Sequence, residues 1–218
     1  MSEFSITELS RIRRVPKRGH YDKDTIYRIL DEGLVCHVGF VEDHQPVVIP
    51  MNYARRADAL ILHGATASRL LKYVQAGHPV CVTVTLLDGL VLARSVYHHS
   101  MNYRSVVVFG RGRLIEAEQE KLAALEVLTE HILRGRWQDA RKPNRQELDA
   151  TAVVSIAIES ASAKVRTGPA ADDEDDYQLP VWAGVVPIQQ QALTPVSDPQ
   201  LRKDIRVPPS VSNYRRTR

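Results

Sequence analysis

Residues 79–95 read "PVCVTVTLLDGLVLARS" and contain two apolar runs separated by Asp88 and Gly89. The first run alternates apolar residues with threonines, and both runs are rich in valine and leucine, as is typical of β-strands. Aspartate and glycine both tolerate positive φ, so the Asp88–Gly89 pair predicts a tight hairpin. Two strands joined by so short a turn run antiparallel, and the stretch therefore predicts an antiparallel sheet.

Apolar runs on both sides of this stretch extend the sheet. Strands are predicted at residues 34–41, 45–53, 59–64, 105–116 and 152–168, and helices at 22–32, 67–74 and 118–134. Strands that follow one another through short turns exclude a doubly wound parallel sheet. We therefore expect a mainly β fold with flanking helices, an antiparallel β-barrel of six or seven strands.

The composition is ordinary for a soluble globular protein, with 44% hydrophobic and 25% charged residues among 218. We predict one domain over residues 1–192 and an extended basic C-terminal segment over 193–218, which has prolines and no periodicity. No run approaches the roughly 18 apolar residues of a membrane helix, and the first 18 residues lack the apolar core of a secretion signal. With Cys36 and Cys81 interpreted as free thiols, the expected location is the cytoplasm.

The net charge of +3 is distributed unevenly along the chain. Residues 201–218 carry six basic residues and one acidic residue, a net charge of +5, which leaves −2 for the rest. A body of this charge does not suit nucleic acid, and the basic end lacks the interleaved aromatic residues of a nucleic-acid platform. The acidic run at 172–176 is interpreted as a solvated loop.

Residues 97–105, "YHHSMNYRS", place two histidines side by side. At the end of a strand His98 and His99 would point to opposite faces, so they cannot bind one ion together. No other histidine pair has metal-site spacing, and the G-x-S-x-G elbow of serine hydrolases is missing. Gly110 and Gly112 lack the third glycine of a dinucleotide fingerprint and indicate a bent strand instead. We expect no metal site.

Residues 62–74, "LHGATASRLLKYV", combine the end of a strand with the start of a helix at about Thr66. The first turn of a helix presents free backbone N–H groups, and Thr66 and Ser68 add hydroxyl donors. The Arg69 guanidinium matches phosphate oxygens, and Gly64 permits a close approach to the backbone. These features fit a phosphate-binding cradle and a capped surface helix equally well.

Four stretches taken in order resemble one family: "VVIPMNY" (47–53), "LHGATASRLL" (62–71), residues 79–95 and "HHSMNYRSVVVFGRGRLIE" (98–116). This family is the pyridoxamine 5′-phosphate oxidase-related superfamily of FMN-binding split β-barrel proteins, specifically its nitroimidazole-reductase-like (Nim-type) branch. The resemblance covers about residues 12–190. It implies a six- or seven-stranded split β-barrel, FMN as cofactor, and a homodimer with two sites at its interface.

The resemblance also implies roles for individual residues. The strand 48–53 runs beside the isoalloxazine ring of FMN, Arg69 binds the phosphate, and Arg104 with Ser105 replaces an Arg-Gln pair that touches the ring. Trp182 resembles a late tryptophan that reaches the cofactor across the dimer. Strand alternation makes His98 the histidine expected to contact substrate. The expected cofactor-binding residues are Val48, Ile49, Pro50, Met51, Asn52, Tyr53, His63, Gly64, Thr66, Ser68, Arg69, Arg104, Ser105 and Trp182.

The chain departs from the oxidase itself in three places, and one of them is the strand "VVIPMNY" (47–53), where the oxidase carries basic residues. Leu70 stands where the oxidase has a lysine after its Ser-Arg pair, and the Arg-x-His substrate clamp has no counterpart after Trp182. We therefore expect an FMN-dependent oxidoreductase that reduces a small electron-poor substrate with NAD(P)H, without an identifiable catalytic side chain. Two alternatives stay open: a flavin- or haem-binding protein without turnover, and a deazaflavin-dependent reductase on the same fold.

Overall fold

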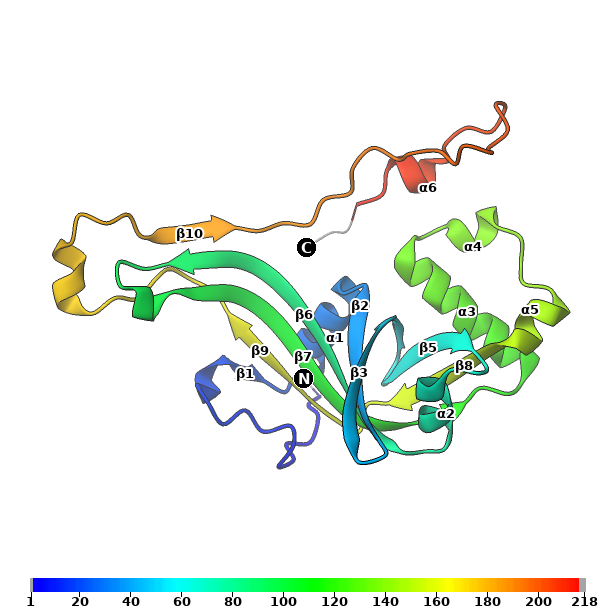
Figure 1. The fold of residues 1–218 in the computed structure, drawn as a ribbon, viewed down its shortest axis with the longest axis horizontal. Helices are drawn as coiled ribbons and strands as arrows, with labels where there is room; N and C mark the ends of the chain where they lie inside the picture. The colour runs from blue at the N-terminus through cyan, green and yellow to red at the C-terminus, as the bar shows by residue number, and fades with distance from the viewer. Residues whose placement is uncertain (1, 216–218) are drawn as a thin grey trace.

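The computed structural model describes residues 2–215, shown in Figure 1. Its helices are α1 (Lys23–Glu32), α2 (Arg69–Gln75), α3 (Glu118–Ile132), α4 (Arg136–Asp139), α5 (Arg145–Ala150) and α6 (Pro209–Ser212), with 3₁₀ helices η1 (Pro16–Arg18), η2 (Val96–His98) and η3 (Glu174–Gln178). Its strands are β1 (Gly19–His20), β2 (Val35–Glu42), β3 (Gln45–Asn52), β4 (Ala54–Arg56), β5 (Ala59–Ala65), β6 (Pro79–Leu92), β7 (Ser100–Leu114), β8 (Thr151–Ala157), β9 (Ser160–Arg166) and β10 (Gly184–Pro187). No helix in this described part is long and apolar enough to cross a membrane.

The strands form one antiparallel system in the order β3-β2-β6-β7-β8-β5-β4, with β9 beside β7 and β10 beside β6. This path ends at β3 and β4 without closing, which is the arrangement of a split barrel. The predicted fold class is therefore confirmed. The described residues form ten strands rather than six or seven. The short strands β1, β4 and β10 were not predicted, the strand predicted at 152–168 is divided into β8 and β9, and the two runs of 79–95 join in β6.

The division between the two halves of the barrel occurs along β7. This strand pairs with β9 as far as Phe109 and then with β8 from Gly112 onward. A Cβ on Gly110 would lie 1.8 Å from the Ala157 carbonyl oxygen, so the turn from β8 to β9 passes directly over a residue that has no side chain. The bend predicted at Gly110 or Gly112 therefore coincides with the change of partner.

The prediction of a tight hairpin at Asp88 and Gly89 is wrong. β6 continues through both residues, and its register with β7 shifts between Leu87 and Gly89 as in a β-bulge. Here β6 pairs with β7 on one side and β10 on the other, so tertiary pairing overrides the local turn preference. The chain actually reverses through residues 93–99, and the predicted antiparallel arrangement holds between β6 and β7.

The core lies inside the barrel, with a smaller apolar cluster between the sheet and α3. α1 starts at its Asp22 cap, whose carboxylate accepts from the Thr25 N–H at 2.8 Å, and it buries one apolar stripe in the barrel. β5 and β8 are buried on both faces, because Leu62 and Val154 face the barrel while Ile61 and Val153 face α3. This double burial explains why both strands are nearly continuous apolar runs.

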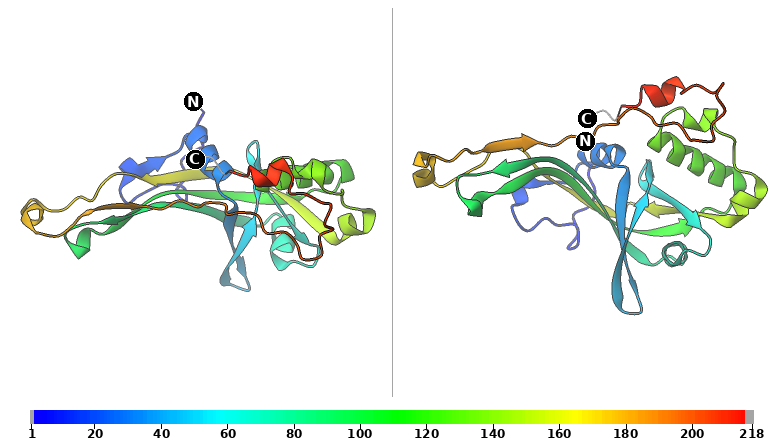
Figure 2. Two further views of the ribbon diagram at one scale, coloured as in Figure 1. Left: turned by 90° about the horizontal axis from the view of Figure 1, so that it is seen from above. Right: turned by 45° about the horizontal axis from the view of Figure 1, so that its top comes forward.

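The long β6–β7 hairpin extends beyond the barrel, together with η3 and β10, and forms what we call the arm (residues 87–103 and 172–187; Figure 2). The acidic run at its end is not simply solvated. The Asp172 carboxylate is 1% exposed, accepts from the N–H groups of Arg94 and Ser95, and forms an ion pair with the Arg94 guanidinium at 3.2 Å. Asp172 therefore fastens η3 to the tip of the hairpin.

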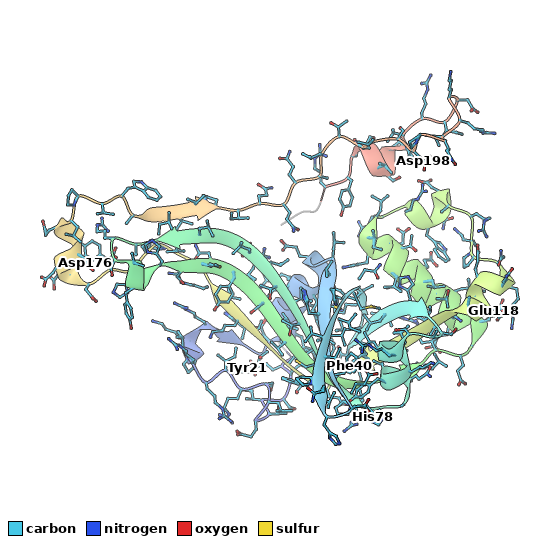
Figure 3. All side chains as sticks on the ribbon, viewed as in Figure 1. Tyr21, Phe40, His78, Glu118, Asp176 and Asp198 are labelled. Atoms are coloured by element: carbon cyan, nitrogen blue, oxygen red, sulfur yellow. The ribbon has the colours of Figure 1, made fainter. Side chains whose placement is uncertain are left out.

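After β10 the chain forms what we call the strap, residues 189–207, which leads to α6 (Figure 1). In α6, directly after the strap, the Ser210 hydroxyl donates to the Asp139 carboxylate of α4 at 3.0 Å. Figure 3 shows how far the strap extends: Asp176 lies at the tip of the arm, and Asp198 lies at the opposite end of the molecule. The boundary at residue 192 between domain and C-terminal segment stays a prediction.

Candidate functional site

β3 is the terminal strand of the sheet and pairs with β2 along its whole length. Its other edge faces no strand within residues 2–215. Alternation along β3 sends Val47, Ile49 and Met51 toward the core, and it leaves Val48 63% exposed and Pro50 exposed on the opposite face. β3 thus offers an open backbone edge and an apolar outer face, which suits a flat aromatic ligand.

Tyr53 directly follows β3 and belongs to the core. Its side chain is fully buried, its hydroxyl donates to the Leu30 carbonyl at 2.5 Å, and its ring lies 5.5 Å from that of His131. Asn52, the last residue of β3, is half-buried. Of the predicted stretch 48–53, Tyr53 therefore has only its backbone to offer a ligand.

α2 begins at Arg69, two or three residues later than predicted, because Ser68 is its N-cap. The Ser68 hydroxyl accepts from the Leu71 N–H at 3.4 Å, and the Thr66 N–H donates to the Ala150 carbonyl. The capped helix is thus present. The Arg69 guanidinium is 58% exposed and contacts the Glu42 carboxylate at 2.7 Å, beside the β2–β3 turn. The Glu42 carboxylate therefore contacts Arg69 where the phosphate was predicted.

Aromatic packing holds α2 against the β2–β3 hairpin. The ring of Tyr73 lies 5.1 Å from that of Phe40 and 4.7 Å from that of His78. Figure 3 shows Phe40, which belongs to β2, and His78 close together in the lower part of the view. The hairpin, α2 and the end of β5 thus form one continuous surface.

His63 and Gly64 lie near the end of β5 and, as neighbours in a strand, they point to opposite faces of the sheet. A Cβ on Gly64 would lie 3.1 Å from Leu71, so this glycine admits α2 rather than a ligand. His63 is half-buried, and its Nδ1 atom is buried without a hydrogen-bond partner among the described residues. Burial lowers the pKa of His63, which favours the neutral imidazole. An unsatisfied buried nitrogen of this kind is uncommon, which makes His63 a candidate contact for a ligand.

Arg104 lies at the centre of a triad with Glu32 and Asp88. Its guanidinium donates two hydrogen bonds to Asp88, at 2.8 and 2.9 Å, and two to Glu32, one of them at 2.8 Å. The contacts with Asp88 and then Glu32 raise the pKa of Arg104. These carboxylates occupy the guanidinium fork, so the sequence prediction missed that Arg104 has structural partners. Its partners Asp88 and Glu32 are 16 and 72 residues away in the sequence, so no local pattern indicates these ion pairs.

Ser105 and Trp182 lie away from the surface formed by β3 and α2. Ser105 lies on β7, and β2 and β6 separate this strand from β3. Its hydroxyl donates to the Lys164 carbonyl of β9 at 3.3 Å. Trp182 precedes β10 on the arm, is 66% exposed, and packs its ring over Gly184. Within one protomer the Arg69–Glu42 contact links the start of α2 to the β2–β3 turn, whereas Ser105 lies on β7 and Trp182 on the arm.

His98 lies at the tip of the arm. The strand alternation used to select it does not apply, because Val96–His98 is a 3₁₀ helix. Its Nε2 atom is 3.2 Å from the carboxylate of Asp173, and Asp176 brings a third ligand-type atom within 4.8 Å. Asp173 is 82% exposed, and exposed carboxylates often gather in this way without an ion. The contact ties η3 to η2, and we assign no metal to it.

Comparison with known proteins adds the wider context. The sequence model described as pyridoxamine 5′-phosphate oxidase matches residues 22–165. The flavocytochrome Anf3 from Azotobacter vinelandii is 40% identical with a TM-score of 0.90, and the alignment covers 96% of this chain and 97% of that chain. The FAD and haem binding protein from Mycobacterium smegmatis is 34% identical with a TM-score of 0.86, over 90% of this chain and 96% of that chain.

A more distant match is a proposed 5-nitroimidazole antibiotic resistance protein from Bacteroides thetaiotaomicron. It is 26% identical with a TM-score of 0.58, and the alignment covers 67% of this chain and 86% of that chain. No curated protein matches the chain. The family model matches well over half of the chain and the antiparallel fold agrees with it, so the resemblance inferred from the sequence is confirmed. The chain belongs to the pyridoxamine 5′-phosphate oxidase family of split β-barrel proteins.

Proposed function

We propose that the protein is a homodimeric, flavin-dependent oxidoreductase that uses NAD(P)H to reduce a small electron-poor substrate. The observation that carries this proposal is the surface formed by β3 and the start of α2. It combines an open strand edge and an exposed apolar face with an exposed arginine at one end. An aromatic ring system with a phosphate tail needs these three features.

The residues present fit a flavin nucleotide. Arg69 would hold the phosphate as a bidentate donor, while the backbone edge of β3 and the Asn52 amide would meet the polar edge of the ring. Val48 and Pro50 would cover one face of the ring and exclude water. When bound, the flavin supplies the electron and hydride transfer, and the protein supplies binding, orientation and electrostatics.

The kind of flavin is part of the proposal. The sequence resemblance implies FMN, whereas the 34% identical relative from M. smegmatis is named for binding FAD. We favour FAD, because that relative aligns over 90% of this chain. The contact that we assign to Arg69 is common to both, since each nucleotide places a phosphate at the end of the ribityl chain.

A homodimer would unite the separated parts of the predicted site. Ser105 and Trp182 lie away from β3 within one protomer, so a second copy is needed to bring such groups to the same flavin. The outer face of β2 and β3 is also apolar, with Val35, Val41 and Val48 each at least 50% exposed. Apolar side chains gathered on one sheet face commonly mark an interface.

A second candidate function is favoured by the similarity to a flavocytochrome at 40% identity over 96% of the chain. In this candidate the protein binds haem as well as flavin. Haem iron takes a neutral imidazole nitrogen as an axial ligand. His63 offers a buried nitrogen without a partner in the described structure and a pKa lowered by burial, so the chain holds a residue of the required kind. Haem would supply one-electron chemistry, and its absorbance distinguishes the two candidates.

Substitutions at the start of α2 test the flavin site. We expect Arg69→Ala to weaken binding of added FAD or FMN by about 1.5–3 kcal/mol, because a charge-assisted contact to phosphate is lost. Glu42→Gln should tighten binding by about 0.2–1 kcal/mol, since it removes the carboxylate that competes for Arg69. Both affinities are measured by titrating the apoprotein and following quenching of flavin fluorescence.

Arg113→Ala is the matched control. Arg113 is 64% exposed and pairs with Glu120 at 2.7 Å, the distance between Arg69 and Glu42, but it lies at the end of β7. Its loss should leave flavin affinity unchanged. Equal affinities for the Arg69→Ala and Arg113→Ala proteins would place the phosphate elsewhere.

A further inference from the structure

The strap is an extended segment that has almost no contact with its own protomer. Every residue from 189 to 207 is exposed, and Leu193 and Val196 are 83% and 96% exposed. Its hydrogen bonds within the described chain are all local, such as those from the N–H groups of Leu201 and Ile205 three residues back. Figures 1 and 2 show it leaving β10 as an extended chain that turns back near its far end before it reaches α6.

A segment of this kind needs contacts outside the protomer to adopt a single conformation. Fixing a backbone residue costs about 1–2 kcal/mol of conformational entropy, and the strap offers little burial of its own to offset this. Nevertheless, the superposition on the A. vinelandii flavocytochrome extends over 96% of this chain with a TM-score of 0.90. The remaining 4% is about nine residues, so at least about half of the nineteen-residue strap lies within the superposed part.

We propose that the strap wraps around a second copy of this chain. The strap continues directly from β10 and the arm, where Val181, Trp182 and Val186 are between 41% and 66% exposed. The outer face of β2 and β3 adds further exposed valines. In a twofold dimer the strap of each protomer would contact the same surface on the other protomer, so the same set of residues would form both contacts. The proposal rests on the homodimer proposed above but not on its flavin.

The size of this surface agrees with a stable dimer. A standard interface takes about 20–30 residues from each partner. The strap provides nineteen exposed residues, and the arm and the β2–β3 face provide twelve exposed apolar ones: Val35, Val41, Val48, Leu87, Val96, Tyr97, Met101, Tyr177, Leu179, Val181, Trp182 and Val186. An isolated protomer would leave all of them in water, which is unusual for a soluble monomer.

Photo-cross-linking on the full chain tests the proposal. A benzophenone amino acid is placed in turn at Leu193, Val196 and Leu201, and at Ala123 on the exposed side of α3 as a control. We expect irradiation to give a covalent dimer from at least one strap position and none from position 123. Irradiation that leaves all three strap variants monomeric on a denaturing gel would overturn the proposal.

Two charge substitutions provide an independent measurement. Leu193→Asp with Val196→Asp should raise the dimer dissociation constant at least about tenfold, because two apolar contacts become charged. Leu9→Asp, at a 73% exposed residue near the N-terminus, is the control. Unchanged dimerisation of the doubly substituted protein would also contradict the proposal.

Flavin content, measured on the same samples, separates this inference from the proposed function. Flavin-loaded dimers in which the strap neither cross-links nor affects association would refute the strap inference and leave the flavin function intact. A wild-type protein that is monomeric but binds flavin would refute both the dimer and the strap. Strap cross-links in a protein that takes up no flavin would refute the flavin function alone.

Discussion

We expect replacement of Gly110 by alanine to lower the free energy of unfolding by at least about 3 kcal/mol. The added Cβ would lie 1.8 Å from the Ala157 carbonyl oxygen and 3.1 Å from its carbonyl carbon. Both atoms belong to the backbone where β8 turns into β9, so neither can move without disturbing the pairing of β7 with both strands. Denaturant unfolding at constant m-value measures this loss.

Gly39→Ala is the matched control for this substitution. Gly39 also lies within a strand, β2, but a Cβ there would meet its nearest atom, the Cys81 carbonyl oxygen, at an ordinary contact distance of 3.5 Å. We expect this protein to lose less than about 1 kcal/mol. If Gly110→Ala were tolerated as well as Gly39→Ala, the crossing of the β8–β9 turn over β7 would have to be wrong.

We expect Arg104→Leu to destabilise the protein by about 2–3 kcal/mol, because Asp88 and Glu32 lose the guanidinium between them. The side chains of all three residues are only about a fifth exposed, which places the effect well above that of a surface ion pair. The partly exposed setting keeps it below the 3–5 kcal/mol typical of a fully buried pair. Thermal and denaturant unfolding both measure the difference.

A double-mutant cycle identifies the cause of this loss. Adding Asp88→Asn to Arg104→Leu should restore part of the stability, since it removes a carboxylate that has lost its guanidinium. Arg113→Leu, at an ion pair that is mostly exposed, should change stability little. If the Arg104→Leu protein were no less stable than the Arg113→Leu protein, the triad would contribute no net stability.

The sequence was informative where local patterns decide the structure. α1, β2 and β3 appear within one residue of the ranges that the apolar patterns predict, 22–32, 34–41 and 45–53. It misled where a tertiary contact competes with a local preference. Asp88 and Gly89 have the composition of a tight turn, but pairing of β6 with strands on both sides keeps this segment extended.

The candidate site shows the same limit. The position of Arg69 at the start of a helix follows from local sequence. Its partner Glu42 is 27 residues away, and the partners of Arg104 are 16 and 72 residues away, so no local pattern reveals these ion pairs. The role of Ser68 as a cap and the close packing of Leu71 on Gly64 likewise depend on where α2 rests on the barrel.

The most direct test of the central claim is the cofactor content of the purified full-length protein. The chain is purified, its absorbance spectrum is recorded, and any bound nucleotide is released by heat and identified by chromatography. We predict a yellow protein with the absorbance bands of oxidised flavin, which bleach when NAD(P)H is added without oxygen. A colourless protein that takes up neither added FAD nor added FMN would contradict the account.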